Sequence, residues 1–379
     1  MSKFVLHHAS VACAALIAAS LSAAEIGRSR VVSTVGARLD YDSNIFVNNS
    51  EVHDWVYSMN GGVRVIHDVS ELTTDVGVWA NGQIFTDHSD QNSFDPGIDA
   101  RLAYVPSDKT NIKVGTSWRR SSMANEALNT RAKSADFALN GQWEHLASEK
   151  FGARLTGDYT KSDYRTAGYS DLANYSVGVD AIYVYSPKLK ALAGVTWGES
   201  WTSHRSFNRR NPGGDDTRYT VGFEGELAPK VTGELSVGVQ KRSFATASFG
   251  DNSSLYLSTR LTWAAAQKTV WNLRASQGLN VTAADQSSKN FDSSLSLTQE
   301  LAERLSLEGS VGYTRANYSS FGGAGARRDH GANARLRLNY ALSESASIDA
   351  SAGIRDNSSD LATSDYQQFN FGAGFTYRF

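Results

Sequence analysis

Cysteine is almost absent from this sequence. The only one, Cys13, lies near the N-terminus, so the rest of the chain has no thiol. This excludes disulfides, thiolate catalysis and cysteine-ligated metals there. Proline is also scarce, with 5 residues in 379. Because proline interrupts the interior of strands, a chain this poor in proline can form many long ones.

A charge excess and long apolar runs are lacking as well. The formal net charge is −2, which leaves no basic footprint for nucleic acid. Mean hydropathy is −0.37, and beyond the N-terminal segment no apolar run is long enough for a membrane helix. Strands that alternate polar and apolar residues still cross membranes, because they leave no hydropathy peak.

The N-terminus has the organisation of a secretion signal. Lys3 precedes an apolar stretch over 4–21, and Ser22-Ala23-Ala24 is a small-residue cleavage site. We therefore predict a signal peptide over 1–24 and one domain over 25–379. Lipid modification of Cys13 is the alternative, but the apolar segment before it is short.

Short turn signals recur at intervals of about 39 residues, the length of a long hairpin with its loop and turn. Pro106-Ser107-Asp108-Lys109 is typical, and similar groups lie near 68–71, 147–150, 186–188, 228–230, 265–268, 302–304 and 343–345. Between the turns, residues alternate with period two. In the last segment Phe369, Phe371 and Phe375 alternate with polar residues and glycine, which predicts half-buried strands.

The pattern predicts an all-β, antiparallel, up-and-down transmembrane barrel of about 18 strands with both ends in the periplasm. A soluble sandwich also alternates, but its strands are usually shorter. The predicted strands span 31–41, 54–66, 72–85, 94–105, 110–120, 133–145, 151–162, 173–185, 190–201, 217–227, 231–243, 254–263, 269–280, 290–301, 305–315, 331–342, 346–356 and 366–379.

The apolar register is predicted to face lipid. Seven of the eight tryptophans fall in it and lie towards strand ends, as expected for aromatic girdles. Charges in this register are mostly basic and lie at the long-loop ends, where they are candidates to meet lipopolysaccharide phosphates or simply to be solvated. These charges are Arg120, Lys133, Lys161, Lys241, Lys289, Arg315 and the acidic Asp356.

The other register is predicted to line a water-filled lumen, because unpaired charges in a dry core are prohibitive. Its mixed signs predict modest charge selectivity. The candidate lumen-lining residues are Arg101, Lys113, Arg119, Arg154, Asp158, Asp180, Arg218, Glu224, Arg242, Arg260, Arg274, Glu308, Arg335, Arg337, Asp349 and Arg355. Trp79 also falls in the inward register, although a slip of one residue would turn it to lipid.

Three connections are long enough to fold inward and constrict the lumen: 42–53, 202–216 and 316–330. The second is the best candidate, since its charges would narrow a polar pore. An exposed loop is the simpler alternative. Its charged residues are Arg205, Arg209, Arg210, Asp215 and Asp216.

Catalytic and metal-binding patterns are missing from the sequence. The histidines are scattered without ligand spacing, and His204 with Asp215 is only a forced acid–base pair. Gly322-Gly323-Ala324-Gly325 follows no βαβ unit, so it is no phosphate-binding loop. We therefore expect no enzymatic activity, no cofactor and no metal.

Two motifs carry a family resemblance. Tyr41-Asp42-Ser43-Asn44-Ile45-Phe46, at the end of the first strand, resembles the start of the β-barrel porin type 2 family, and Tyr377-Arg378-Phe379 resembles the C-terminal assembly signature of outer-membrane barrels. The resemblance implies a bacterial outer-membrane pore that exports a polysaccharide with a periplasmic polysaccharide-export protein. A diffusion porin for small hydrophilic solutes and a closed structural or adhesive barrel stay open as alternatives.

Overall fold

A computed structural model describes residues 25–26, 28–204, 209–210, 214–244, 252–284, 286–319 and 326–379. The predicted signal peptide over 1–24 lies outside them, so it stays a prediction. No helix within the described ranges is long and apolar enough to cross a membrane.

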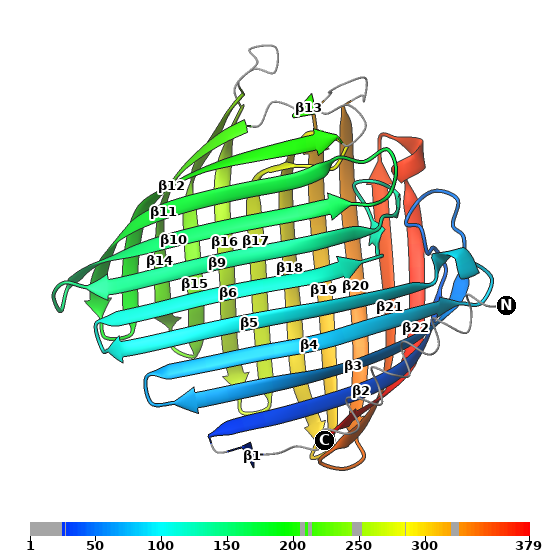
Figure 1. Cartoon of the computed structure of the whole chain (residues 1–379), viewed down its shortest axis with the longest axis horizontal. Coiled ribbons are helices and arrows are strands. Elements are labelled where there is room, and N and C mark those ends of the chain that lie inside the picture. The colour runs from blue at the N-terminus through cyan, green and yellow to red at the C-terminus, as the bar shows by residue number, and fades with distance from the viewer. Residues whose placement is uncertain are drawn as a thin grey trace.

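The described chain forms a closed barrel of eighteen antiparallel strands (Figure 1). Each strand pairs with its neighbours along the chain, and the first pairs with the last between Thr34 and Arg378 and onward to Asp42 and Asn370. The barrel strands are β2 (Ser29–Asp42), β3 (Asp54–Val69), β4 (Leu72–Phe85), β5 (Ser93–Ser107), β6 (Thr110–Ser121), β9 (Ser134–Leu146), β10 (Phe151–Tyr164), β11 (Asp171–Ser186), β12 (Leu189–His204), β14 (Gly214–Ala228), β15 (Val231–Phe244), β16 (Asn252–Ala266), β17 (Thr269–Val281), β18 (Ser287–Ala302), β19 (Leu305–Tyr318), β20 (Arg327–Ala341), β21 (Ala346–Ser359) and β22 (Tyr366–Arg378). The predicted fold class and strand count are confirmed.

Short turns gather at one end of the barrel and long connections at the other. All the short turns coincide with the predicted turn signals. The C-terminal Phe379 donates its backbone N–H to the Ser33 carbonyl at 2.9 Å, and Arg378 donates to Ser345 in a short turn. The short strand β1 (Glu25–Ile26) pairs with Ser29 and Arg30 at this same end. Both ends of the barrel domain thus lie at the short-turn end, and its periplasmic location stays a prediction.

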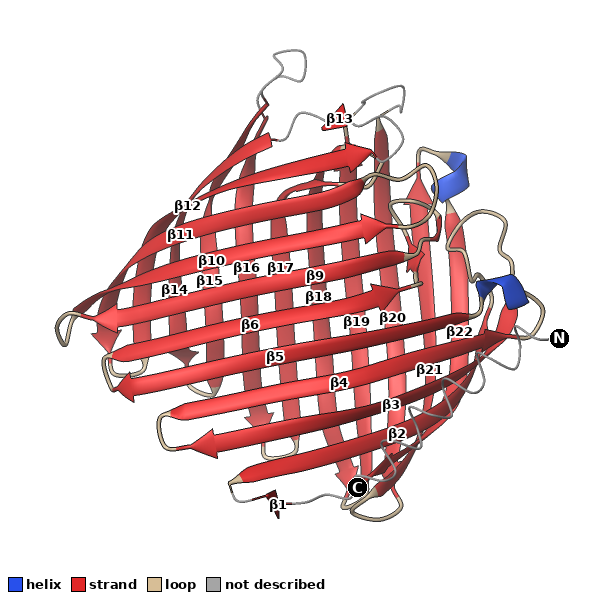
Figure 2. Cartoon of the chain, viewed as in Figure 1, coloured by secondary structure: helices blue, strands red, loops and turns tan. Residues whose placement is uncertain are grey.

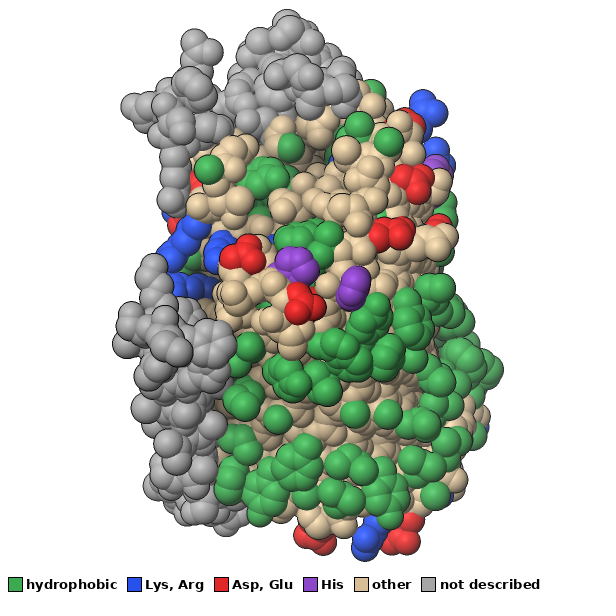
Figure 3. Space-filling view, turned by 90° about the vertical axis from the view of Figure 1, so that its right-hand side faces the viewer, with side chains coloured by type: hydrophobic (Ala, Val, Ile, Leu, Met, Phe, Trp, Pro, Cys, Tyr) green, Lys and Arg blue, Asp and Glu red, His purple; other side chains and the backbone are tan. Residues whose placement is uncertain are grey.

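The strand registers give the wall two chemically different faces. Leu155, Val179 and Val195 oppose one another on β10, β11 and β12, and Leu155 and Val179 are exposed on the outer surface. Asp158 and Ser176 are paired on the other face of the same strands. Figure 3 shows the result as a broad apolar band, with charges at the short-turn tips and polar groups above the band.

The long connections pack together rather than standing apart in solvent. Ile45, which is 1% exposed, forms a buried cluster with Val56 and Phe85. Two single-turn 3-10 helices, η1 (Ser89–Gln91) and η3 (Ala362–Ser364), lie in these connections (Figure 2). A buried apolar cluster therefore lies at the long-loop end.

Candidate functional site: a constriction in the barrel lumen

The sequence-predicted lumen residues occupy strand positions on the inner face, opposite the exposed apolar side chains. In β20, for example, Arg335 and Arg337 alternate with the exposed Leu336 and Leu338. The same parity holds for the others: Arg101, Lys113, Arg119, Arg154, Asp158, Asp180, Arg218, Glu224, Arg242, Arg260, Arg274, Glu308, Asp349 and Arg355.

Many of these charges are neutralised by partners on the inner wall. Arg154 contacts Glu144 and Glu224, each at 2.6 Å, and Glu144 also contacts Lys190. Arg38 bonds Asp349 in the same way near the β2–β22 closure. The predicted residue set did not include Glu144, Lys190 and Arg38, although their parity along the strand would have identified them.

A hairpin that the sequence did not reveal folds into the lumen. It comprises β7 (Ala124–Asn125) and β8 (Thr130–Arg131), within the connection 122–133 between β6 and β9. Its turn is closed locally, since the Asn125 side chain accepts from the Ala127 N–H at 3.0 Å. Asn125, Ala127 and Leu128 line the main lumen cavity. We call 122–133 the inner hairpin.

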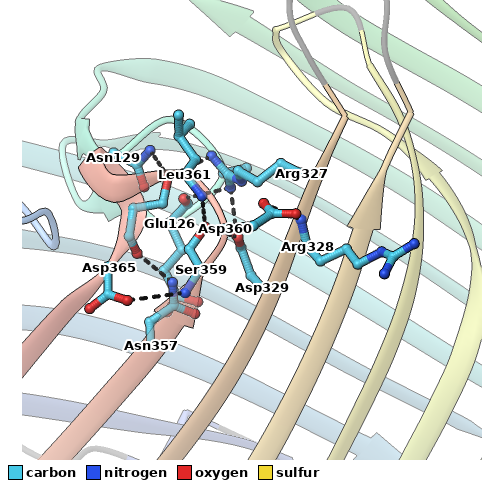
Figure 4. Close-up of polar contacts among 12 residues, drawn as sticks. Glu126, Asn129, Arg327, Arg328, Asp329, Asn357, Ser359, Asp360, Leu361 and Asp365 are labelled. Carbon is cyan, nitrogen blue, oxygen red and sulfur yellow. Dashed lines mark hydrogen bonds and ion pairs between the residues drawn. The ribbon is translucent and has the colours of Figure 1, made fainter.

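Arg327, whose side chain is 7% exposed, anchors the inner hairpin to the far wall (Figure 4). It donates to the Glu126 carbonyl at 3.3 Å and to Ser364 in η3 at 3.0 Å, and pairs with Asp329 at 2.7 Å. The Asn129 amide fits these neighbours best with its nitrogen donating to the Glu126 carbonyl at 2.9 Å. The buried polar groups of the hairpin are thus paired, as such groups must be.

Glu126 and Arg131 make the remaining ionic and cation contacts of the inner hairpin. The Glu126 carboxylate accepts from Arg355 on β21, and both side chains are exposed. Arg131 donates to Gln83 at 3.0 Å, and its guanidinium lies 4.6 Å from the Phe85 ring centre. Burial lowers the pKa of Arg131 from its ordinary value, while the nearby Asp95 and Asp42 oppose this shift.

The motif Tyr41–Phe46, which carries the family resemblance, also helps to hold the inner hairpin in place. Asn44 is fully buried and donates to the carbonyl of Asn48 at 2.7 Å. Asn48 in turn donates to the Asn129 carbonyl at 3.2 Å. Gln368 donates to Asp42 at 2.8 Å, which links the motif to β22. The motif therefore joins the barrel closure to the inner hairpin.

An open cavity of about 640 Å³ remains beside the inner hairpin. Its wall is polar and comes mainly from β10–β12 and β14–β18. Arg218 lies over the Tyr256 ring at 4.3 Å, and the nearby Arg242 is paired with Asp216 at 2.5 Å. Tyr256 is therefore an inward aromatic side chain of this cavity.

The connection predicted to constrict the lumen is placed differently. Asp215 and Asp216 lie in strand β14 rather than in a loop, with only Asp216 on the inner face. Arg209 and Arg210 form the short strand β13 (Arg209–Arg210), which pairs with β12, and Arg205 lies outside the described residues. The inward-folded connections seen are 122–133 and the predicted candidate 42–53. In 316–330, the ends belong to β19 and β20, and residues 320–325 lie outside the described residues.

The predicted basic charges of the outer register lie at the long-loop ends of their strands. Lys161 opposes Phe137 on β9 and is bonded to Asp163 at 2.8 Å. This ion pair shows that acidic side chains lie beside the basic ones at the long-loop ends of the strands. Contact with lipopolysaccharide stays a prediction.

No three histidine, cysteine, aspartate or glutamate side chains gather as metal ligands in the parts of the chain that the structure describes. His88 serves the fold instead: its ring and backbone nitrogens both contact the buried carboxylate of Asp54 at 2.9 Å.

Comparison with solved structures finds barrels of low similarity. The siderophore receptor PirA from Pseudomonas aeruginosa is 10% identical with a TM-score of 0.45, covering 92% of this chain and 80% of that one. The outer membrane protein OpdK from the same organism, solved with vanillate, is 8% identical with a TM-score of 0.48, covering 92% and 99%. No curated protein matches.

The family comparison is specific. The model described as "Putative beta-barrel porin 2" matches residues 24–379, nearly the whole chain. A porin family, a closed barrel and an outward apolar band together place this protein in the bacterial outer membrane. The chain belongs to the β-barrel porin 2 family.

Proposed function

We propose that this protein is a pore for polar solutes and that the inner hairpin forms its constriction. The supporting observation is the hairpin itself, which leaves a polar cavity of about 640 Å³ beside it. An eighteen-stranded barrel is wide enough to hold an aqueous channel, and a folded-in connection narrows it. The paired charges of the wall favour neutral or weakly charged solutes over strongly charged ones.

The test is conductance in planar bilayers. Replacing Ala124–Arg131 by a short Gly-Ser linker is expected to raise single-channel conductance, because the passage widens. The matched control replaces the exposed Ala167 and Gly168, in the β10–β11 connection, by Gly-Ser and is expected to leave conductance unchanged, because it keeps the Thr166 hydroxyl that accepts from the Lys133 N–H of the inner hairpin. A barrel that conducts nothing in either form would instead be the closed structural or adhesive barrel.

For the cargo we propose a polysaccharide moving outward, with a periplasmic polysaccharide-export protein as partner. The support is the resemblance carried by Tyr41–Phe46 together with the inward aromatic side chains. A diffusion porin for small hydrophilic solutes is the second candidate, and the paired, nearly neutral wall also suits it. Cells lacking the chain should retain polymer in the periplasm if export is its role, and should lose only small-solute uptake otherwise.

A further inference from the structure

We propose that Trp79, on the inner wall beside the inner hairpin, is a stacking platform for the pyranose ring of a neutral saccharide. This deepens the proposed pore function by naming a binding subsite inside the lumen. Trp79 lies in the middle of β4, between the outward residues Val78, which is exposed, and Ala80, which is half-buried. It is half-buried and lines a cavity of about 280 Å³.

The indole of Trp79 lies flat over the neighbouring strand. Gly97 is its partner on β5 and Gly62 its partner on β3. A Cβ placed on Gly97 would lie 2.3, 2.5 and 2.8 Å from three ring carbons, Cζ2, Cε2 and Cη2. Such similar distances to adjacent ring atoms require an approach to the ring face rather than to its edge. One face therefore covers the glycine, and the other is directed towards the lumen.

Polar side chains border the ring on its long-loop side. Asn81 on β4 lies two residues from Trp79, on the same face of the wall. It opposes Asn60 on β3 and Asp95 on β5. Asn60 and Asn81 are exposed, and their amides have no hydrogen-bond partner among the residues that the structure describes. Each amide offers donors and an acceptor at a fixed place beside the ring.

The charged side chains level with Trp79 on the inner wall, and those one step nearer the short turns, are paired with one another. Arg119 is the partner of Gly97 on β6 and is paired with Asp136 at 3.3 Å. Arg64, one step towards the short turns, is bonded to Asp75 at 2.5 Å and to Asp99 at 3.0 Å. Charges around the platform are thus balanced within the wall.

This combination suits a sugar. A pyranose has an apolar face of C–H groups that covers an aromatic ring, and hydroxyls at its rim that need donors and acceptors. Because Gly97 has no side chain, one face of the indole lies against the wall and the other is turned to the lumen, with the Asn60 and Asn81 amides at its edge. Because the charges around the platform are balanced within the wall, a neutral ligand is favoured over a strongly charged one. The cavity volume is near the lower bound for small-ligand sites, which fits one or two sugar units.

The test uses maltohexaose and the complete folded barrel. In planar bilayers the sugar is expected to interrupt the current of the unmodified protein, and Trp79→Ala should shorten these interruptions about tenfold or more. Gly97→Leu should have the same effect, because its side chain displaces the ring. Trp79→Phe should retain part of the binding. The control is Trp118→Ala, which removes an outward tryptophan and should change nothing.

Calorimetric titration of maltohexaose into the barrel in detergent separates this inference from the pore function. If the barrel conducts but Trp79→Ala and the unmodified protein respond equally to the sugar, the subsite is wrong while the pore stands. If the sugar binds through Trp79 but no current flows, the pore is wrong while the subsite stands. Heat-modifiable migration in gels checks that every variant is folded.

Discussion

At the scale of single residues, Arg242 on β15 is an almost completely desolvated cation in the wall. Its side chain is 2% exposed, and it donates to both oxygens of Asp216, at 3.0 and 2.5 Å, and to the carbonyl of Asn280 at 3.0 Å. Removing one partner of such a pair leaves the other charge without compensation.

We predict that Arg242→Met destabilises the barrel by about 2–3 kcal/mol, less than the roughly 3–5 kcal/mol of a fully buried pair because Asp216 borders the lumen cavity. Adding Asp216→Leu should restore most of the loss. The measurement is urea unfolding in lipid vesicles, followed by tryptophan fluorescence.

Arg260→Met is the matched control for that prediction. Arg260 pairs with Glu234 at 3.5 Å on the same wall, but the two side chains are 67% and 45% exposed. An exposed pair of this kind contributes less than about 1 kcal/mol. Equal losses for Arg242→Met and Arg260→Met would show that burial does not strengthen the Asp216 pair.

The face of the wall that each side chain occupies was predictable from the sequence, whereas its interaction partners on other strands were not. The inward position of Trp79 follows from strict alternation along β4. In contrast, Arg154 on β10 contacts Glu224, which lies 70 residues away on β14. Barrel tilt and curvature bring these two groups together, and neither is encoded in a local pattern.

At the scale of elements, Arg327 contributes several of the contacts that hold the inner hairpin to β20 and η3. We predict that Arg327→Gln loosens the hairpin, because it removes the bonds to Ser364 and Glu126 and the stacking on Tyr318. The loss of two or three such contacts, at about 1 kcal/mol each, should speed amide hydrogen exchange over 122–133 at least about tenfold.

The neighbouring Arg328 provides a control of the same chemistry. Its side chain is exposed and extends away from the hairpin (Figure 4). Arg328→Gln should leave exchange over 122–133 unchanged. If both variants exchange alike, the hairpin is held by its other contacts, including the Arg131–Phe85 stacking.

The short turns were predictable and the inner hairpin was not, for one physical reason. Turns such as Pro106–Lys109 and Ser186–Lys188 carry their own signal, because local residues decide them. The hairpin strands are two residues long, too short for any alternation. Asn129 is bonded to Ser364, 235 positions further along the chain, so its position is fixed by tertiary contacts alone.

At the scale of the whole molecule, strand number and closure follow from repetition of one local pattern. Every hairpin repeats the same two-residue period, and pairing β2 with β22 removes the last free edges. The sequence cannot show how the long connections share the space inside, because those contacts join segments from opposite ends of the chain.

Because one face of the wall contacts lipid and the other lines the lumen, we expect the two faces to tolerate a new charge differently. Val179 lies on the outer face in the middle of β11, between Tyr175 and Tyr183 of the aromatic girdles, while Thr196 on β12 lies at the same depth on the inner face. Val179→Arg should cost roughly 2–4 kcal/mol, since it places a charge in the hydrocarbon at the bilayer centre. Thr196→Arg should cost little, because its charge enters the polar lumen. Unfolding of both variants in lipid vesicles measures the difference, and a Thr196→Arg barrel destabilised as strongly as Val179→Arg would mean that the inner face is no more tolerant of charge than the lipid face.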